Sequence, residues 1–170
     1  MKKIGRGSYG LVLAGYHKRT RKQANRKLYA IKQLKKTEIK KDHLLENIKM
    51  EKEIMTKPTS PFITQLSYAF KDNSSYFLAM EYAQGGDIFD LINTKDNMKK
   101  TPAPLDEESI RFILGCTIMG LEYLHNKNII YHDMKPENLL LFADGYVKIA
   151  DFGLSEKFTK LLKEMHVGTP

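Results

Sequence analysis

Two short strings in the second half of the chain hold the residue types of an acid–base and metal site. The first is Tyr131-His132-Asp133-Met134-Lys135-Pro136-Glu137-Asn138, and the second, Asp151-Phe152-Gly153, begins 18 residues after Asp133. A carboxylate can accept a proton from a hydroxyl, a lysine can neutralise an anionic group, and Asn and Asp oxygens suit Mg2+. Asp and Asn also form turns, so the rest of the chain must decide between the two interpretations.

A glycine-rich string near the start of the chain suits an anionic ligand. Residues Gly5-Arg6-Gly7-Ser8-Tyr9-Gly10-Leu11-Val12 fit G-x-G-x-x-G-x-V, in which glycines let backbone amides approach phosphate oxygens. A dinucleotide-binding fold uses the same glycines to open a helix. Here Leu11 to Ala14 is typical of a strand, which favours a β-hairpin flap. A turn without a ligand remains the alternative.

Lys32 follows the apolar string Leu28 to Ile31 and ends a predicted strand. A lysine at a strand end usually faces water, and it can be aimed at phosphates only where a carboxylate holds it. Glu51, 19 residues later on a predicted helix, is the expected partner. Glu46 and Glu53 are its competitors.

The elements that must position these residues follow from apolar patterning. Strands are predicted at 1–4, 11–14, 28–31 and 76–80, and a helix from Thr37 to the prolines Pro58 and Pro61. Residues 93–105 read as a loop, and Asp106 begins a long helix. The apolar face predicted for that helix is Ile110, Ile113, Leu114, Thr117, Ile118, Leu121 and Leu124. Short apolar pieces follow, and Asp144-Gly145 predicts a hairpin turn.

This order predicts an α+β chain of two parts. Residues 1–80 form a β-rich half with one main helix, and residues 81–170 form a mainly helical half with short hairpins. A crevice between two such lobes is the expected ligand site. There is no apolar run near eighteen residues, so no membrane span is predicted. The single cysteine, Cys116, lies in an apolar string and is expected to be a buried thiol in an intracellular, cytoplasmic setting, with the nucleus as an alternative.

The net charge of +8 is unevenly distributed. Residues 1–80 carry 18 Lys/Arg and 6 Asp/Glu, whereas residues 81–170 carry 10 and 14. The basic runs Lys18 to Lys27 and Lys32 to Lys41 could meet nucleic acid or anionic lipid. A solvated basic loop and helix face is favoured instead, because no aromatic residues for base stacking are interleaved in the second run. Nucleic acid is therefore not an expected partner.

Taken together, the strings resemble those of eukaryotic-type protein kinases over nearly the whole chain, with the order glycine loop, Lys, Glu, catalytic loop and D-F-G. Within that family the chain resembles the AGC group, including the cyclic-AMP-dependent and microtubule-associated serine/threonine kinases. Further resemblances are the strings Ser60-Pro61-Phe62-Ile63, Met80-Glu81-Tyr82-Ala83-Gln84-Gly85-Gly86-Asp87 and Val167-Gly168-Thr169-Pro170.

The resemblance implies roles for residues at matching positions. Asp133 would accept the substrate hydroxyl proton, Lys135 would neutralise the transferring phosphoryl group, and Asn138 and Asp151 would hold Mg2+. Lys32 and Glu51 would form the ion pair that orients the ATP phosphates. The remaining ATP-binding positions would be Ile4, Gly5, Gly7, Ser8, Gly10, Val12, Ala30, Met80, Glu81, Ala83, Asp87, Glu137 and Leu140. Thr169 would support Asp133, and Met55, Leu66, Tyr131 and Phe152 would stack as an internal spine.

Three departures from the family pattern accompany the resemblance. His132 replaces the usual arginine, and Met165 stands where AGC kinases carry a phosphothreonine. The chain also stops at Pro170, before the A-P-E element and the later helices of the large lobe, so a fragment and a truncated kinase-like protein both remain open. The favoured function is transfer of the γ-phosphoryl of Mg-ATP to a protein serine or threonine, with an activating partner as one means of ordering the segment. The alternative is an ATP-binding but inactive interaction module.

Overall fold

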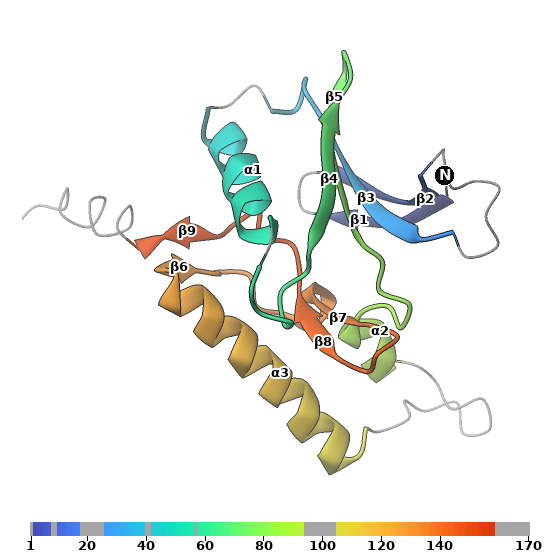
Figure 1. The fold of residues 1–170 in the computed structure, drawn as a ribbon, viewed down its shortest axis with the longest axis vertical. Coiled ribbons are helices and arrows are strands. Elements are labelled where there is room, and N and C mark those ends of the chain that lie inside the picture. The colour runs from blue at the N-terminus through green and yellow to red at the C-terminus, as the bar shows by residue number, and fades with distance from the viewer. Residues whose placement is uncertain are drawn as a thin grey trace, which may run out of the picture. The chain divides into compact units, whose positions relative to one another are not determined.

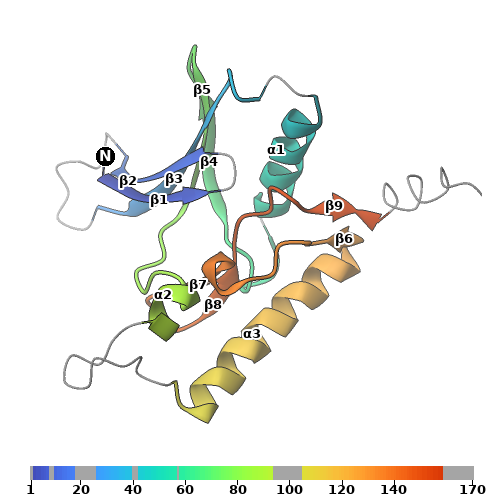
Figure 2. The same cartoon turned by 180° about the vertical axis from the view of Figure 1, so that it is seen from behind.

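The computed structural model describes residues 2–7, 10–17, 26–39, 42–56, 58–93 and 105–158. The chain divides into two compact units. Unit 1 comprises Met1–Pro58 with Thr64–Tyr82, and unit 2 comprises Thr59–Ile63 with Ala83–Pro170. Figures 1 and 2 show the elements of both units from opposite sides.

Unit 1 is a five-stranded antiparallel sheet with one helix. The strand order is β1-β2-β3-β5-β4. The elements are β1 (Lys2–Gly7), β2 (Gly10–Tyr16), β3 (Leu28–Lys35), α1 (Asp42–Met55), β4 (Leu66–Lys71) and β5 (Ser75–Glu81). In Figures 1 and 2, α1 stands beside the sheet on the side of β4 and β5.

The register of β2 and β3 sorts the side chains of the sheet onto two faces. Val12 pairs with Lys32, and Ala14 pairs with Ala30. Because side chains alternate along a strand, Val12, Ala30 and Lys32 share one face. Leu34 lies on that face too and is fully buried, so this is the face that contributes to the core of unit 1.

Among its described residues, unit 2 contains two α-helices and two short antiparallel strand pairs. Its elements are α2 (Ile88–Asn93), α3 (Glu107–Asn126), β6 (Ile129–Ile130) paired with β9 (Glu156–Lys157), and β7 (Leu139–Leu141) paired with β8 (Val147–Ile149). A 3-10 turn, Pro136–Asn138, leads into β7. The predicted turn between β7 and β8 is confirmed: Gly145 has φ 85°, and Asp144 accepts a hydrogen bond from the N–H of Tyr146.

Helix α3 begins where its sequence predicts. The Asp106 carboxylate accepts a hydrogen bond from the N–H of Ser109 at 2.6 Å, which satisfies one of the free donors of the first turn. The packed face includes the buried residues Cys116, Thr117, Gly120 and Leu124. A Cβ on Gly120 would lie 2.8 Å from Cδ1 of Ile149 and 3.2 Å from the carbonyl oxygen of Phe62, so a larger residue here would force Ile149 to shift where α3 approaches β8. The buried thiol expected at Cys116 is confirmed.

Part of the predicted apolar face of α3 is wrong. Ile110, Leu114 and Ile118 are 44%, 54% and 62% exposed, whereas Thr117 and Leu124 are buried as predicted. The helix carries apolar side chains over a wide arc, and periodicity alone does not say which part of that arc meets β8.

Other boundaries differ from the sequence prediction. The first helix begins at Asp42 rather than Thr37, because residues 36–38 form a turn, and β1 extends to Gly7. Strands β4 and β9 were not predicted. β4 is a mostly exposed edge strand and β9 has two residues, so neither shows a buried alternation. Among the described residues, no helix has the length and apolar character to span a membrane.

Candidate active site

Lys32 and Glu51 form a buried ion pair within unit 1. Nζ of Lys32 lies 2.7 Å from Oε1 of Glu51, and the two residues are 2% and 1% exposed. β3 supplies the lysine and the middle of α1 supplies the glutamate. Glu51, the expected partner, is therefore in contact with Lys32, whereas the side chains of its competitors Glu46 and Glu53 are exposed. The hydrogen-bonded contact offsets part of the cost of burying the two charges, which would be large for either group alone.

The glycine string forms the end of the β1–β2 pair. Gly5 pairs with Val12 and Gly7 with Gly10. A Cβ on Gly10 would lie 2.1 Å from the carbonyl oxygen of Gln33, so β2 can pass β3 this closely only with glycine there. Ile4, the preceding predicted contact, is 42% exposed. Ser8 lies outside the described residues.

The predicted adenine-binding string follows β5. Met80 is buried, and Glu81 is tied to the start of β4 by two bonds: its N–H donates to the carbonyl of Gln65 at 3.1 Å, and its carboxylate accepts from the N–H of Gln65 at 2.8 Å. These bonds fix the backbone of unit 1 at its last residues. Ala83, the next predicted contact, begins the second part of unit 2.

The catalytic-loop string gathers polar groups around Asp133 in unit 2. Nζ of Lys135 lies 2.9 and 2.8 Å from the two carboxylate oxygens of Asp133. Nδ2 of Asn138 donates to the carbonyl of Asp133 at 2.8 Å and to its Oδ2 at 2.9 Å. The carboxylate is thus held in one orientation from both sides, as a proton acceptor requires.

Electrostatic interactions also link Lys135 to the acidic residues around it. The hydrogen bond to Asp133 is the largest cause of a raised pKa of Lys135; burial opposes it, and the charges of Asp133, Asp151 and Glu137 raise the pKa further. Lys135 is therefore positive throughout the neutral range.

Asn138 and Asp151, the predicted metal ligands, are joined through the backbone. The N–H of Ala150 donates to the carbonyl of Asn138 at 2.9 Å. Asp151 has φ 54°, a conformation that costs energy for a residue with a side chain and that recurs at functional sites. Among the described residues, no group of three or more His, Cys, Asp or Glu could hold a metal. Two oxygen ligands nevertheless fit Mg2+, which commonly takes one or two carboxylates together with substrate phosphates.

Tyr131 and Ser155 support this arrangement through hydrogen bonds that the sequence did not reveal, whereas the contact of Tyr131 with Phe152 is part of the expected spine. The buried hydroxyl of Tyr131 donates to the carbonyl of Ala150, and its ring packs edge-on against Phe152 with centroids 5.6 Å apart. Oγ of Ser155 donates to the carbonyl of Tyr131 at 3.4 Å. Backbone carbonyls accept these bonds, so no residue-type pattern could have predicted them.

Three more predicted contacts lie near β7. Asp87 forms an isolated bridge with Leu140, and its carboxylate accepts a hydrogen bond from the N–H of Asp90 at 2.8 Å, at the start of α2. Glu137 is exposed in the 3-10 turn. Thr169 and Met165 lie outside the described residues.

Comparison with known proteins places these geometries in a family. A profile of the protein kinase domain matches residues 1–170. The chain belongs to the protein kinase domain family. The bilobal α+β fold expected from the sequence is the fold of that family, and the two units of this kinase chain carry its sheet-rich and helical portions.

Named relatives of this kinase chain are serine/threonine kinases. It is 38% identical over 92% of its length to a probable serine/threonine-protein kinase, pkgA, of Dictyostelium discoideum. It is 36% identical over 98% of its length to a cGMP-dependent protein kinase of Plasmodium berghei, and 39% over 94% to mouse ribosomal protein S6 kinase alpha-2. The chain spans only 10%, 18% and 20% of these three proteins.

Proposed function

We propose that this protein transfers the γ-phosphoryl group of Mg-ATP to a serine or threonine hydroxyl of a protein substrate. The observation that carries the proposal is the clamped carboxylate of Asp133, held by Lys135 and Asn138 at 2.8–2.9 Å. A carboxylate in this setting accepts the hydroxyl proton, while the adjacent ammonium offsets charge on the moving phosphoryl group.

Each unit contributes residues to this chemistry. Unit 1 supplies the Lys32–Glu51 pair, in which Glu51 aims the lysine at the phosphates, and the β1–β2 glycines for the phosphate backbone. Unit 2 supplies Asn138 and Asp151 as Mg2+ ligands. When bound, Mg2+ neutralises phosphate charge; the chain's own contribution is positioning rather than covalent chemistry.

We further propose that the chain belongs to the AGC group of kinases and that the protein is located inside the cell, in the cytoplasm. The cGMP-dependent and S6 kinase relatives support the first part. The buried, unpaired Cys116 agrees with a reducing compartment. The small-lobe and large-lobe division at residues 80 and 81 belongs to the same proposal.

Phosphoryl transfer and nucleotide binding are measured separately to test the proposal. Purified chain is incubated with Mg-ATP labelled on the γ-phosphate and a basic peptide that contains serine, and Asp133→Asn is the matched control because it keeps the shape of the side chain. We expect labelled phosphoserine with the parent chain and a roughly 10²-fold or greater loss with Asp133→Asn. In parallel, Mg-ATP should raise the melting temperature of both proteins by mass action.

The two measurements separate the rival functions. A thermal shift with no transfer would favour the inactive ATP-binding module. Neither a shift nor transfer from a folded sample would overturn the proposal.

A further inference from the structure

The sheet of unit 1 carries a row of aromatic side chains on the face opposite Lys32. Tyr68 pairs with Ala79, and Ala79 pairs with Ile31, so the three share a face. Ile31 and Lys32 are adjacent in β3 and therefore point to opposite faces. We call this set of ring side chains the aromatic face; its members are His17, Tyr29, Tyr68, Phe70 and Phe77.

The rings of the aromatic face contact one another and remain partly accessible. The ring centre of Tyr68 lies 5.7 Å from His17 and 5.5 Å from Tyr29. Phe70 and Phe77 stack at 4.9 Å with 12° between their planes. Tyr68 and Phe70 are 47% and 51% exposed. They are two residues apart on edge strand β4, so they stand on the same side about 7 Å apart.

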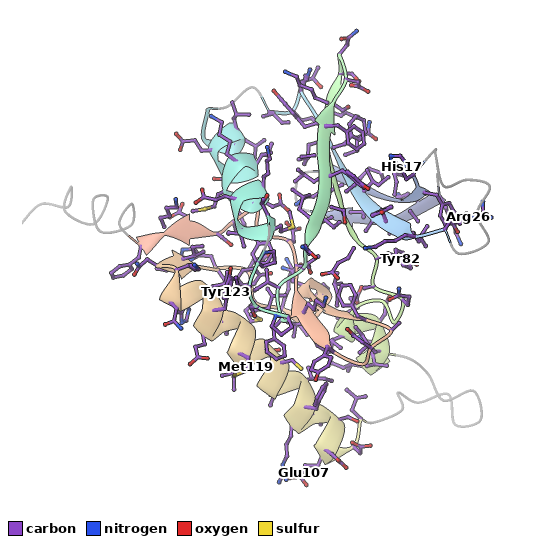
Figure 3. All side chains as sticks on the ribbon, viewed as in Figure 1. His17, Arg26, Tyr82, Glu107, Met119 and Tyr123 are labelled. Carbon is purple, nitrogen blue, oxygen red and sulfur yellow. The ribbon has the colours of Figure 1, made fainter. Side chains whose placement is uncertain are left out.

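Cations lie beside these rings. Lys3 pairs with Leu13 and so shares the aromatic face, and Nζ of Lys27 lies 5.7 Å from the ring centre of Tyr29. Arg26 lies 4.7 Å from the ring centre of Tyr16, but Tyr16 pairs with Leu28 and so lies on the opposite face, and Arg26 is not counted among these cations. Figure 3 labels His17 on the side of the sheet away from α1.

One acidic residue lies in the same register and offsets part of this charge. Glu81 pairs with Tyr29, and its carboxylate accepts the N–H of Gln65. Residues 1–80 carry 18 Lys/Arg against 6 Asp/Glu, so the field around the aromatic face favours an anionic partner.

We propose that the aromatic face binds single-stranded nucleic acid, with bases stacked on Tyr68 and Phe70 and phosphates close to Lys3 and Lys27. Exposed rings at two-residue spacing on a sheet can each receive a base, and flanking cations follow the backbone. A duplex hides its base faces, and an acidic peptide would use the cations but not the ring spacing. The sequence argued against nucleic acid because no aromatic residues are interleaved in the second basic run. The sheet instead brings Lys3 and Lys27 to the face that holds Tyr29 of β3 and Tyr68 and Phe70 of β4. This proposal is independent of the kinase proposal.

The test measures fluorescence anisotropy of labelled oligo-dT and oligo-rU of about twelve nucleotides, each titrated with the 170-residue chain at several salt concentrations. We expect Tyr68→Ala to weaken binding about tenfold through the lost stacking, and Tyr68→Phe to stay within about twofold of the parent. Lys27→Gln should reduce the slope of log Kd against log salt by about 0.7. Phe89→Ala is the matched control, since Phe89 is 45% exposed but belongs to α2 of unit 2.

Several outcomes would overturn the proposal. One is the absence of oligonucleotide binding at low salt by a sample that circular dichroism shows to be folded. Another is equal binding by the parent and by both Tyr68→Ala and Phe70→Ser, which would reduce the effect to charge alone. Tighter, Tyr68-dependent binding of polyglutamate or of phosphatidylserine vesicles would assign the face to an acidic protein or a membrane.

Discussion

The Lys32–Glu51 pair shows how a single contact can serve the site at a cost to stability. Both side chains are almost fully buried. Desolvating two charges can cancel much of their attraction, but removing one partner leaves the other charge buried without compensation. The pair is therefore worth more to function than its net stabilisation indicates.

This asymmetry predicts the behaviour of variants at the pair. Lys32→Met should lower the free energy of unfolding by roughly 3 kcal/mol, because Glu51 is left unpaired. The double variant Lys32→Met/Glu51→Met should recover most of that loss while remaining unable to transfer phosphate. Urea unfolding at pH 7 measures the stabilities. A double variant no more stable than the single one would contradict this account.

Unlike the buried Lys32–Glu51 pair, Lys135 is partly exposed, and the pH dependence of activity tests its role. Its side chain is 40% exposed, and its hydrogen bond to Asp133 raises its pKa above the ordinary value of 10.5. A raised folded-state pKa means that the contact contributes fully below 10.5 and is lost only as the pH rises through the folded value. Kinase activity should therefore show no loss from deprotonation of Lys135 between pH 7 and 9.

Substitution of Lys135 separates turnover from binding. Lys135→Gln should reduce kcat by about 10²-fold, because the charge beside the transferring group is lost, while KM for ATP changes little. Steady-state kinetics against ATP measure both constants. A rise in KM with an unchanged kcat would instead assign Lys135 to nucleotide binding.

At the scale of elements, the start of α3 rests on a titratable cap. The backbone hydrogen bond from Ser109 lowers the pKa of Asp106 below 3.8. A lowered folded-state pKa means that the cap stabilises above pH 3.8 and is lost as the pH falls through the folded value.

Variants of Asp106 should separate capping from charge. Asp106→Ala should lower the melting temperature by a few degrees at pH 7. Asp106→Asn should lose little, because its amide oxygen still caps the helix. Thermal melts across pH 3–7 should show the parent losing stability relative to Asp106→Asn only at the acidic end. A constant difference over that range would show that the cap does not titrate.

The helices and strands also show how much of the fold could be predicted from the sequence. Strands with one buried face, such as β3, and helices with a cap, such as α3, follow from local patterning. Edge strand β4 did not, because four of its six side chains are exposed and its place depends on β5. Likewise Ile118 belongs to an apolar pattern, yet it points away from β8, which only the tertiary contact decides.

The same distinction between local pattern and tertiary contact applies to the candidate site. The strings around Asp133 and Asp151 are local, so residue types indicated them, whereas spacing left Glu46 and Glu53 as competitors of Glu51 for Lys32, and the tertiary contact decides between them. The hydroxyl of Tyr131 donates to the carbonyl of Ala150, 19 residues away, and the amide of Asn138 donates to the backbone carbonyl as well as to the carboxylate of Asp133. Such contacts carry no residue-type signal.

For the molecule as a whole, the residues around the segment after D-F-G bear on whether a phosphate orders that segment. Arginine at the position of His132 would offer a planar fork for a phosphate; histidine has none. The position beside it on β9 is acidic, since Glu156 pairs with Ile130, two residues before His132. The other residue of β9, Lys157, is a cation that pairs with Ile129, so β9 alone neither favours nor disfavours a phosphate, whereas Met165 cannot accept one.

We therefore predict that kinase activity does not require phosphate on this segment. Ser155 is 2% exposed and donates to the carbonyl of Tyr131, so it is inaccessible in the folded state. Thr159 is the only threonine between Gly153 and Gly168. Phosphatase treatment of active protein should leave its activity on a basic peptide within about twofold, as should Thr159→Ala, because packing or an activating partner orders the segment. A large loss after phosphatase, restored by Thr159→Glu, would show instead that the segment is ordered by phosphate.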